Sequence, residues 1–190
     1  TEVLIIGGGP AGASCAARLV SNGVDCIVLD KNAFPRFKPC AGWVTPEVFT
    51  SLNLKPNDYP LGLTHFSSFD ISINGFQVKL LTNQYAIRRY EFDSWLLTAS
   101  GANFMVHEVK QITREQDHFI VDNDFSAKYL VGAGGTHCPV ARTLFPIRKP
   151  ERLIVAMEEE FEYPVQDPAC KLWFFKEKLP GYAWYVPKTN

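Results

Sequence analysis

The sequence lacks several features that would assign it to a common class of protein. Its 19 basic residues nearly balance its 20 acidic ones, and the net charge of −1 argues against nucleic acid as a partner. No apolar run approaches the roughly twenty residues that a membrane-spanning helix needs. The four histidines are scattered without the spacing of metal ligands, so no metal is expected.

The cysteine content also argues against a fold held together by disulfide bonds. The five cysteines form an odd set without a C-x-x-C pair. This pattern is typical of a reducing compartment and not of a disulfide framework, so a cytoplasmic location is expected. The 190 residues, 46% of them hydrophobic, are enough for one large domain or two small ones.

The N-terminus carries a glycine-rich loop in the setting of a dinucleotide-binding site. Glu2-Val-Leu-Ile-Ile6 predicts a strand, and Gly7, Gly9 and Gly12 follow it with the spacing G-x-G-x-x-G. The first glycine makes a tight turn, the second lets the backbone approach a pyrophosphate, and the third packs a helix onto the strand. The N-terminus of that helix favours phosphate. Asp30, eighteen residues after Gly12, is placed to accept hydrogen bonds from an adenosine ribose.

The later pattern does not continue a simple Rossmann fold, because an irregular loop and antiparallel strands replace the next helix and strand. Asn74-Gly75 is typical of a hairpin turn. Predicted helices cover 11–21, a short segment from Pro46 capped by Thr45, and 90–100. Predicted strands cover 24–29, two strands within 63–81, 104–107, a β-meander of 109–112, 118–121 and 127–131, and antiparallel strands at 153–163, 171–175 and 182–186.

Several motifs appear in one order along the whole chain, and together they resemble the FAD-dependent geranylgeranyl reductase family, within the fold of p-hydroxybenzoate hydroxylase. The Cys40 loop and the Tyr182-x-Trp184 motif are the most specific to the reductases. The motifs are the first glycine loop, Pro35-Arg-Phe-Lys-Pro-Cys-Ala-Gly42, Arg89-x-x-Phe92-Asp93, a second glycine loop from Gly132 through Arg142, and Tyr182-x-Trp184.

The resemblance implies an α/β fold. A Rossmann-like FAD-binding domain with a β-meander (1–62 and 87–152) interleaves with an antiparallel-sheet substrate domain (63–86 and 153–190) that is incomplete. The segment that grips the flavin's ribityl chain is expected beyond Asn190, so we expect this chain to hold FAD weakly. The strand from Tyr182 would then form an exposed edge that invites self-association.

The resemblance also assigns residues to the cofactor and to an apolar substrate. Cys40 is the expected catalytic residue at the isoalloxazine edge, where Arg36 and Lys38 would favour a thiolate. Tyr182 and Trp184 would line an isoprenoid-like pocket, to which strand alternation adds Trp173 and Phe175. The expected FAD contacts are Gly7, Gly9, Pro10, Ala11, Gly12, Asp30, Lys31, Arg36, Cys40, Ala41, Gly42, Arg89 at the phosphates or ribityl chain, Val109 at the adenine, Gly132 and Ala133.

The implied activity is transfer of hydride equivalents between FAD and an apolar unsaturated substrate, with NAD(P)H or another electron donor. A lipid substrate would bring the protein close to a membrane surface. Gly134 stands where the family carries Asp, which puts the usual reduction by NADPH in doubt, and Val186 replaces the motif's Phe. Two alternatives stay open: a flavin monooxygenase or halogenase, and a nucleotide-binding module without redox chemistry.

Two further groups are interpreted as structural. His137-Cys138 has no third catalytic partner in the sequence. Glu158-Glu159-Glu160 is interpreted as a solvated strand face and not as a catalytic pair of carboxylates.

Overall fold

The computed structural model describes residues 1–145, 155–164, 169–175 and 181–189. The chain forms two compact units: unit 1 comprises Thr1–Arg36 and Phe92–Glu151, and unit 2 comprises Phe37–Glu91 and Arg152–Asn190. The predicted interleaving put boundaries at 62, 86 and 152. The compact units change at 36, 91 and 151, so residues 37–62 pack with the second unit.

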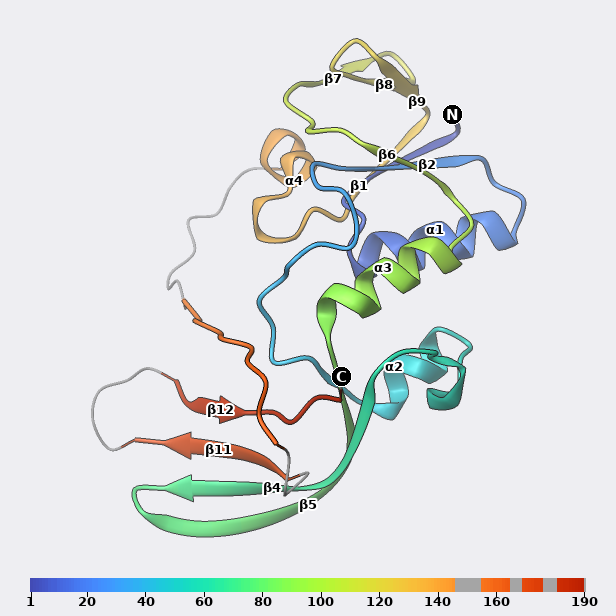
Figure 1. The fold of residues 1–190 in the computed structure, drawn as a ribbon. Coiled ribbons are helices and arrows are strands. Elements are labelled where there is room, and N and C mark those ends of the chain that lie inside the picture. The colour runs from blue at the N-terminus through green and yellow to red at the C-terminus, as the bar shows by residue number, and fades with distance from the viewer. Residues whose placement is uncertain (146–154, 165–168, 176–180, 190) are drawn as a thin grey trace. The chain divides into compact units, whose positions relative to one another are not determined.

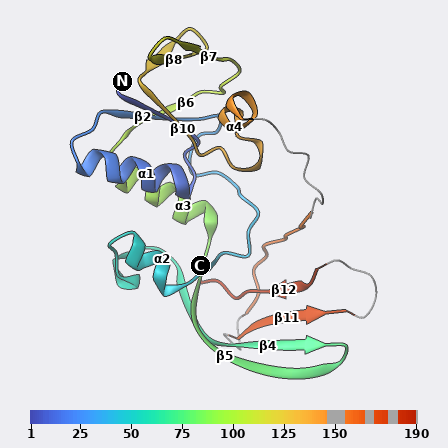
Figure 2. The same ribbon diagram turned by 180° about the vertical axis from the view of Figure 1, so that it is seen from behind.

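Unit 1 contains a four-stranded parallel sheet in the order β10-β1-β2-β6. Leu4, Ile5, Val28 and Leu29 on its central strands are fully buried, which explains the two continuous apolar runs in the sequence. Figures 1 and 2 show helices α1 and α3 side by side on one face of this sheet and the meander on the other. The strands are β1 Val3–Ile6, β2 Cys26–Asp30, β6 Asn103–Val106 and β10 Tyr129–Gly132, and the helices are α1 Pro10–Ser21, α3 Arg89–Ala99 (which starts in unit 2), η2 Gly135–His137 and α4 Pro139–Leu144.

The meander is formed by β7 Ile112–Glu115, β8 His118–Val121 and β9 Phe125–Ala127, all antiparallel. The predicted third meander strand, 127–131, is wrong in this respect. Lys128 separates β9 from β10, and β10 pairs with β1 in the parallel sheet. A stretch predicted as one strand therefore contributes to two sheets, which strand periodicity alone does not reveal.

Unit 2 contains a mixed five-stranded sheet in the order β12-β11-β4-β5-β3. Phe66, Phe69, Cys170 and Leu172 form its buried core, with Trp43 packed against them. The predicted hairpin turn at Asn74-Gly75 is confirmed, since it joins the two long strands. The elements are β3 Trp43–Val44, α2 Pro46–Ser51, η1 Pro56–Asp58, β4 Leu63–Ile73, β5 Phe76–Ile87, β11 Cys170–Phe174 and β12 Ala183–Tyr185.

Two predictions for this sheet need correction. β11 is antiparallel to β12 but parallel to β4, so the sheet is not purely antiparallel. Residues 155–163 form no strand, contrary to the sequence prediction; 153 and 154 lie outside the described residues. β12 lies at one edge of the described sheet. Whether that edge drives self-association stays a prediction.

Candidate functional site: a dinucleotide cradle in unit 1 and an aromatic cavity in unit 2

Two glycines fix the shape of the loop after β1. Gly7 has a φ of +116°, and a Cβ there would lie 2.4 Å from the Ala133 carbonyl oxygen. A Cβ on Gly12 would lie 1.8 Å from the Gly7 carbonyl oxygen. Both contacts are with backbone and cannot be relieved by a rotamer change. The predicted tight turn and close helix packing are therefore present in the structure.

Gly9 is different, because nothing in the fold requires a glycine there. Its φ of −69° and ψ of −176° suit any residue, and a Cβ would meet only the Arg36 Nη2, at 3.3 Å. Pro10 and Ala11 then open α1, and no acidic residue lies in the first turn of the helix. This leaves an open approach to the positive end of a twelve-residue helix, which is where a pyrophosphate binds in such folds.

Asp30, at the carboxyl end of β2, points back to the glycine loop. Its Oδ2 accepts a hydrogen bond from the Gly8 N–H at 2.8 Å, and its Oδ1 accepts one from the Asn32 N–H at 3.0 Å. Each carboxylate oxygen can accept a further bond, so the side chain can still receive a ribose hydroxyl. Lys31, the next residue, is exposed.

Arg36 places a cation beside the glycine loop. Its Nη2 lies 3.6 Å from the Asp93 Oδ2, and its guanidinium stacks 4.7 Å from the centre of the Phe34 ring. The Asp93 side chain on α3 is fully buried, so the ion pair with Arg36 is shielded from water on the Asp93 side. The sequence indicated Arg36 as a cofactor contact but missed Asp93. The sequence did contain a signal for Asp93, because Asp93 is the last residue of the Arg89-x-x-Phe92-Asp93 motif.

The second glycine loop joins the first at the carboxyl edge of the sheet. The Ala133 N–H donates to the Ile6 carbonyl at 2.8 Å. A Cβ on Gly132 would lie 3.0 Å from the Cys138 Sγ, and one on Gly134 would lie 3.0 Å from the Cys138 Cα. The loop packs so closely on the start of α4 that the Asp expected at position 134 would require a backbone shift.

The remaining predicted cofactor residues take scattered positions. Val109 packs against the core between the parallel sheet and the meander, and Arg89 is the first residue of α3. Nearby, His107 Nε2 lies 2.7 Å from the Asp122 Oδ2. Burial raises the pKa of Asp122, but hydrogen bonds from His107 and from the backbone N–H groups of Gln111 and Lys110 outweigh it and hold the pKa below its usual value.

In unit 2, the Cys40 loop is tied to the end of β5. The Ile87 N–H donates to the Gly42 carbonyl at 3.0 Å. Cys40 and Ala41 are half-buried, whereas Gly42 is buried. The other half-buried thiol, Cys15, is on α1, and burial raises its pKa. Cys40 is thus a half-buried thiol on a loop whose backbone is hydrogen-bonded to the end of β5.

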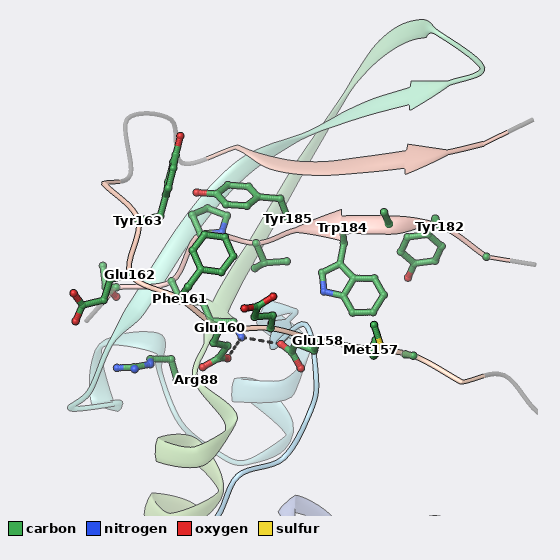
Figure 3. Close-up of a pocket in the computed structure, with 18 of the residues that line it drawn as sticks. Arg88, Met157, Glu158, Glu160, Phe161, Glu162, Tyr163, Tyr182, Trp184 and Tyr185 are labelled. Carbon is green, nitrogen blue, oxygen red and sulfur yellow. Dashed lines mark hydrogen bonds and ion pairs between the residues drawn. The ribbon is translucent and has the colours of Figure 1, made fainter. Parts of the chain in front are cut away.

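A cavity of about 1080 Å³ in unit 2 lies along the edge of β12 that pairs with no other described strand (Figure 3). Tyr182 and Trp184 line it and contact each other with ring centres 6.0 Å apart. Trp173 and Phe175, predicted for the same pocket, do not line it. They belong to β11 and its extension, and β12 separates that strand from the cavity. The other lining residues are Arg88, 155–163, 181, 183 and 185–189.

In the acidic run on the cavity wall, Glu159 and Glu160 are exposed, as the sequence interpretation expected, but Glu158 is not. The Glu158 side chain is only 7% exposed and forms an ion pair with Lys188 at 3.2 Å. Glu160 also bonds Lys188. The lysine could not be associated with this run from the sequence, because it lies about thirty residues further along the chain.

Within the described ranges, no three His, Cys, Asp or Glu side chains gather into a group that could hold a metal ion. The helices described there include none that is both long and apolar enough to cross a membrane.

Comparison with known proteins finds similarity in sequence and in fold. Residues 1–53 match the FAD binding domain family. A protein of Methanosarcina barkeri is 33% identical over 207 residues, covering 100% of this chain and 51% of the relative. Digeranylgeranylglycerophospholipid reductase 1 of Methanopyrus kandleri is 25% identical over 215 residues, covering 98% of this chain and 54% of the relative. PqsL, a probable FAD-dependent monooxygenase from Pseudomonas aeruginosa, superposes with a TM-score of 0.73 at 16% identity, covering 98% of this chain and 57% of PqsL.

These matches confirm the predicted fold class, an α/β fold with a Rossmann-like parallel sheet and a second, mixed sheet. Residues 1–53 are similar to the FAD binding domain family, and the chain as a whole shares its fold with PqsL. It spans about half the length of the relatives it matches. The ligand contacts of individual residues stay predictions.

Proposed function

We propose that the chain is the FAD-binding part of a geranylgeranyl reductase-like oxidoreductase. The flavin would pass hydride equivalents to or from an apolar, unsaturated, isoprenoid-like substrate, with NAD(P)H or another donor supplying electrons. The 25% identity to a digeranylgeranylglycerophospholipid reductase supports this substrate class. Such a substrate would place a cytoplasmic protein close to a membrane surface.

The residues of unit 1 fit the nucleotide half of FAD. The open side of Gly9 and the start of α1 would receive the pyrophosphate, and Arg36 would neutralise part of its charge. Asp30 would accept the ribose hydroxyls. The flavin, when bound, supplies the redox chemistry, so the protein's part is binding, orientation and exclusion of water.

One observation carries the proposal for the substrate side. The cavity lined by Tyr182 and Trp184 is also lined by Glu158 and Lys188, both of which bond the backbone of Cys40. The Cys40 loop was assigned to the flavin edge, and the Tyr182-x-Trp184 motif to the substrate pocket. The two motifs lie about 140 residues apart in the sequence, yet they meet in unit 2. The aromatic rings would hold an apolar chain, and the Cys40 thiol would border its reacting end.

The direct test of the proposed hydride transfer is carried out without oxygen. Full-length protein reconstituted with FAD is reduced with dithionite, excess reductant is removed, and an isoprenoid lipid with unsaturated chains is added. We expect the absorbance of oxidised flavin to return as the lipid gains hydrogen, measured by mass spectrometry. Reoxidation only by oxygen, with peroxide or hydroxylated product, would favour the monooxygenase alternative. A bound flavin that no donor reduces would favour the non-catalytic module.

Trp184→Ala should weaken the response to the lipid without weakening FAD binding. Tyr129→Ala is a matched control, because Tyr129 is a half-exposed aromatic residue on β10, in unit 1. Equal lipid turnover in the Trp184 variant and the wild type would contradict the assignment of the cavity.

A further inference from the structure

The peptide groups of Cys40 are held by side chains from two distant segments of unit 2. The Cys40 N–H donates to the Glu158 Oε2, and the Lys188 Nζ donates to the Cys40 carbonyl oxygen at 3.4 Å. Lys188 also donates to the Glu158 Oε1 at 3.2 Å and to the Glu160 Oε1. Dashed lines in Figure 3 mark the bonds that reach Glu158 and Glu160. One cluster thus joins the loop, the acidic segment and the chain after β12.

Within the cluster, the pair of Glu158 and Lys188 is shielded from water, whereas Glu160 is exposed. The side chains of Glu158 and Lys188 are 7% and 11% exposed. Charges this deeply placed are tolerated only when they are paired and hydrogen-bonded, and removing one partner leaves the other uncompensated. The cluster therefore constrains the loop much more strongly than a surface ion pair would.

The bonds of the cluster to Cys40 involve only its backbone atoms. With the Gly42 carbonyl held by the Ile87 N–H, the backbone is fixed on both sides of the thiol while the side chain stays half-buried. Glu159, between the two bonded glutamates, is exposed and takes no part in the described cluster.

We propose that Glu158 and Lys188 are positioning residues, which fix the Cys40 thiol beside the aromatic cavity. We call the bonds of these two side chains to the Cys40 backbone the clamp. The statement that the thiol lies at the flavin edge rests on the proposed function, whereas the clamp itself rests only on the hydrogen bonds. Loss of the clamp lets the loop sample open conformations, which exposes the thiol. The thiol's reactivity is therefore a direct measure of the clamp, with or without flavin.

The test compares Glu158→Ala with Glu159→Ala. Both proteins are treated with iodoacetamide at pH 8, and labelling of each cysteine is followed by peptide mass spectrometry. We expect Cys40 to be labelled about tenfold faster in the Glu158 variant, the factor that corresponds to the loss of one charge-assisted hydrogen bond. The Glu159 variant should label at the wild-type rate. Cys15 in unit 1 serves as the internal control and should keep its rate in both.

Conservative variants separate positioning from general stability. Lys188→Arg keeps the charge and should label Cys40 within about twofold of wild type, whereas Lys188→Met should resemble Glu158→Ala. Glu158→Gln keeps an acceptor for the Cys40 N–H but loses the ion pair, so it should be intermediate. These variants test the positioning role of the two residues even if Glu158→Ala does not fold.

Two results would overturn the proposal: an unchanged Cys40 rate in Glu158→Gln and Lys188→Met, or an equal rise for Cys15 in those variants. In the FAD-reconstituted protein, the same variants should shift the flavin's absorption maximum or reduction potential. Faster Cys40 labelling in a protein that binds no FAD would refute the proposed function while leaving the clamp intact.

Discussion

The two glycines at positions 9 and 12 belong to the same motif, yet the structure predicts opposite consequences of replacing them. A Cβ on Gly12 would lie 1.8 Å from a backbone carbonyl, whereas one on Gly9 would lie 3.3 Å from the mobile end of Arg36. Gly9→Val should therefore leave the fold intact and block the approach of a pyrophosphate. Gly12→Ala should damage the fold itself.

The magnitudes follow from these contacts. Gly9→Val requires the Arg36 guanidinium to move by only a few tenths of an ångström, which lets it keep its ion pair with Asp93, so the free energy of unfolding should change by less than about 1 kcal/mol. Its isopropyl group would fill the space beside Arg36 and remove at least one charge-assisted hydrogen bond to the cofactor, which weakens FAD binding by about 10- to 100-fold. Gly12→Ala forces a backbone shift and should cost about 3 kcal/mol or more in stability.

Circular dichroism during urea unfolding measures the stabilities, and quenching of FAD fluorescence measures binding. ADP, which contains the pyrophosphate and ribose but no flavin, is a second probe for unit 1. The reasoning fails if Gly9→Val binds FAD and ADP as tightly as wild type, or if it is destabilised as much as Gly12→Ala.

Three further predictions concern single side chains. Asp93→Asn leaves Arg36 without its buried counter-charge, so FAD affinity should fall by about tenfold and the Tm should drop in a thermal melt. Asp122→Asn should destabilise the protein at pH 7 in urea titrations; because the folded-state pKa of Asp122 is lowered, the difference from wild type should start to shrink as the pH falls below about 4 and should vanish below the folded-state pKa. Burial raises the pKa of Cys170 to about 12, so iodoacetamide at pH 8 should modify it only after unfolding.

The first thirty residues illustrate what sequence can predict. Gly7, Gly12 and Asp30 act locally, within a strand–turn–helix unit whose geometry is set by close backbone contacts. Their arrangement therefore follows from spacing alone. The same holds for the hairpin at Asn74-Gly75, where turn chemistry fixes the register of β4 against β5.

The cluster around Cys40 shows what sequence could not predict. Glu158 and Lys188 lie 118 and 148 residues from Cys40, and nothing local in the sequence distinguishes Glu158 from Glu159. Burial of a glutamate is decided by the partner that tertiary structure brings to it. The parallel pairing of β11 with β4 was missed for a related reason, because strand direction depends on long connections and not on side-chain alternation.

The central claim, that the glycine loop of unit 1 holds FAD, is tested most directly by the visible spectrum of full-length protein after FAD reconstitution and removal of free cofactor. We predict the absorption bands of bound flavin in the wild type and their loss in Gly9→Val, with both proteins folded. Colourless wild-type protein that nevertheless binds NADH tightly would contradict the claim.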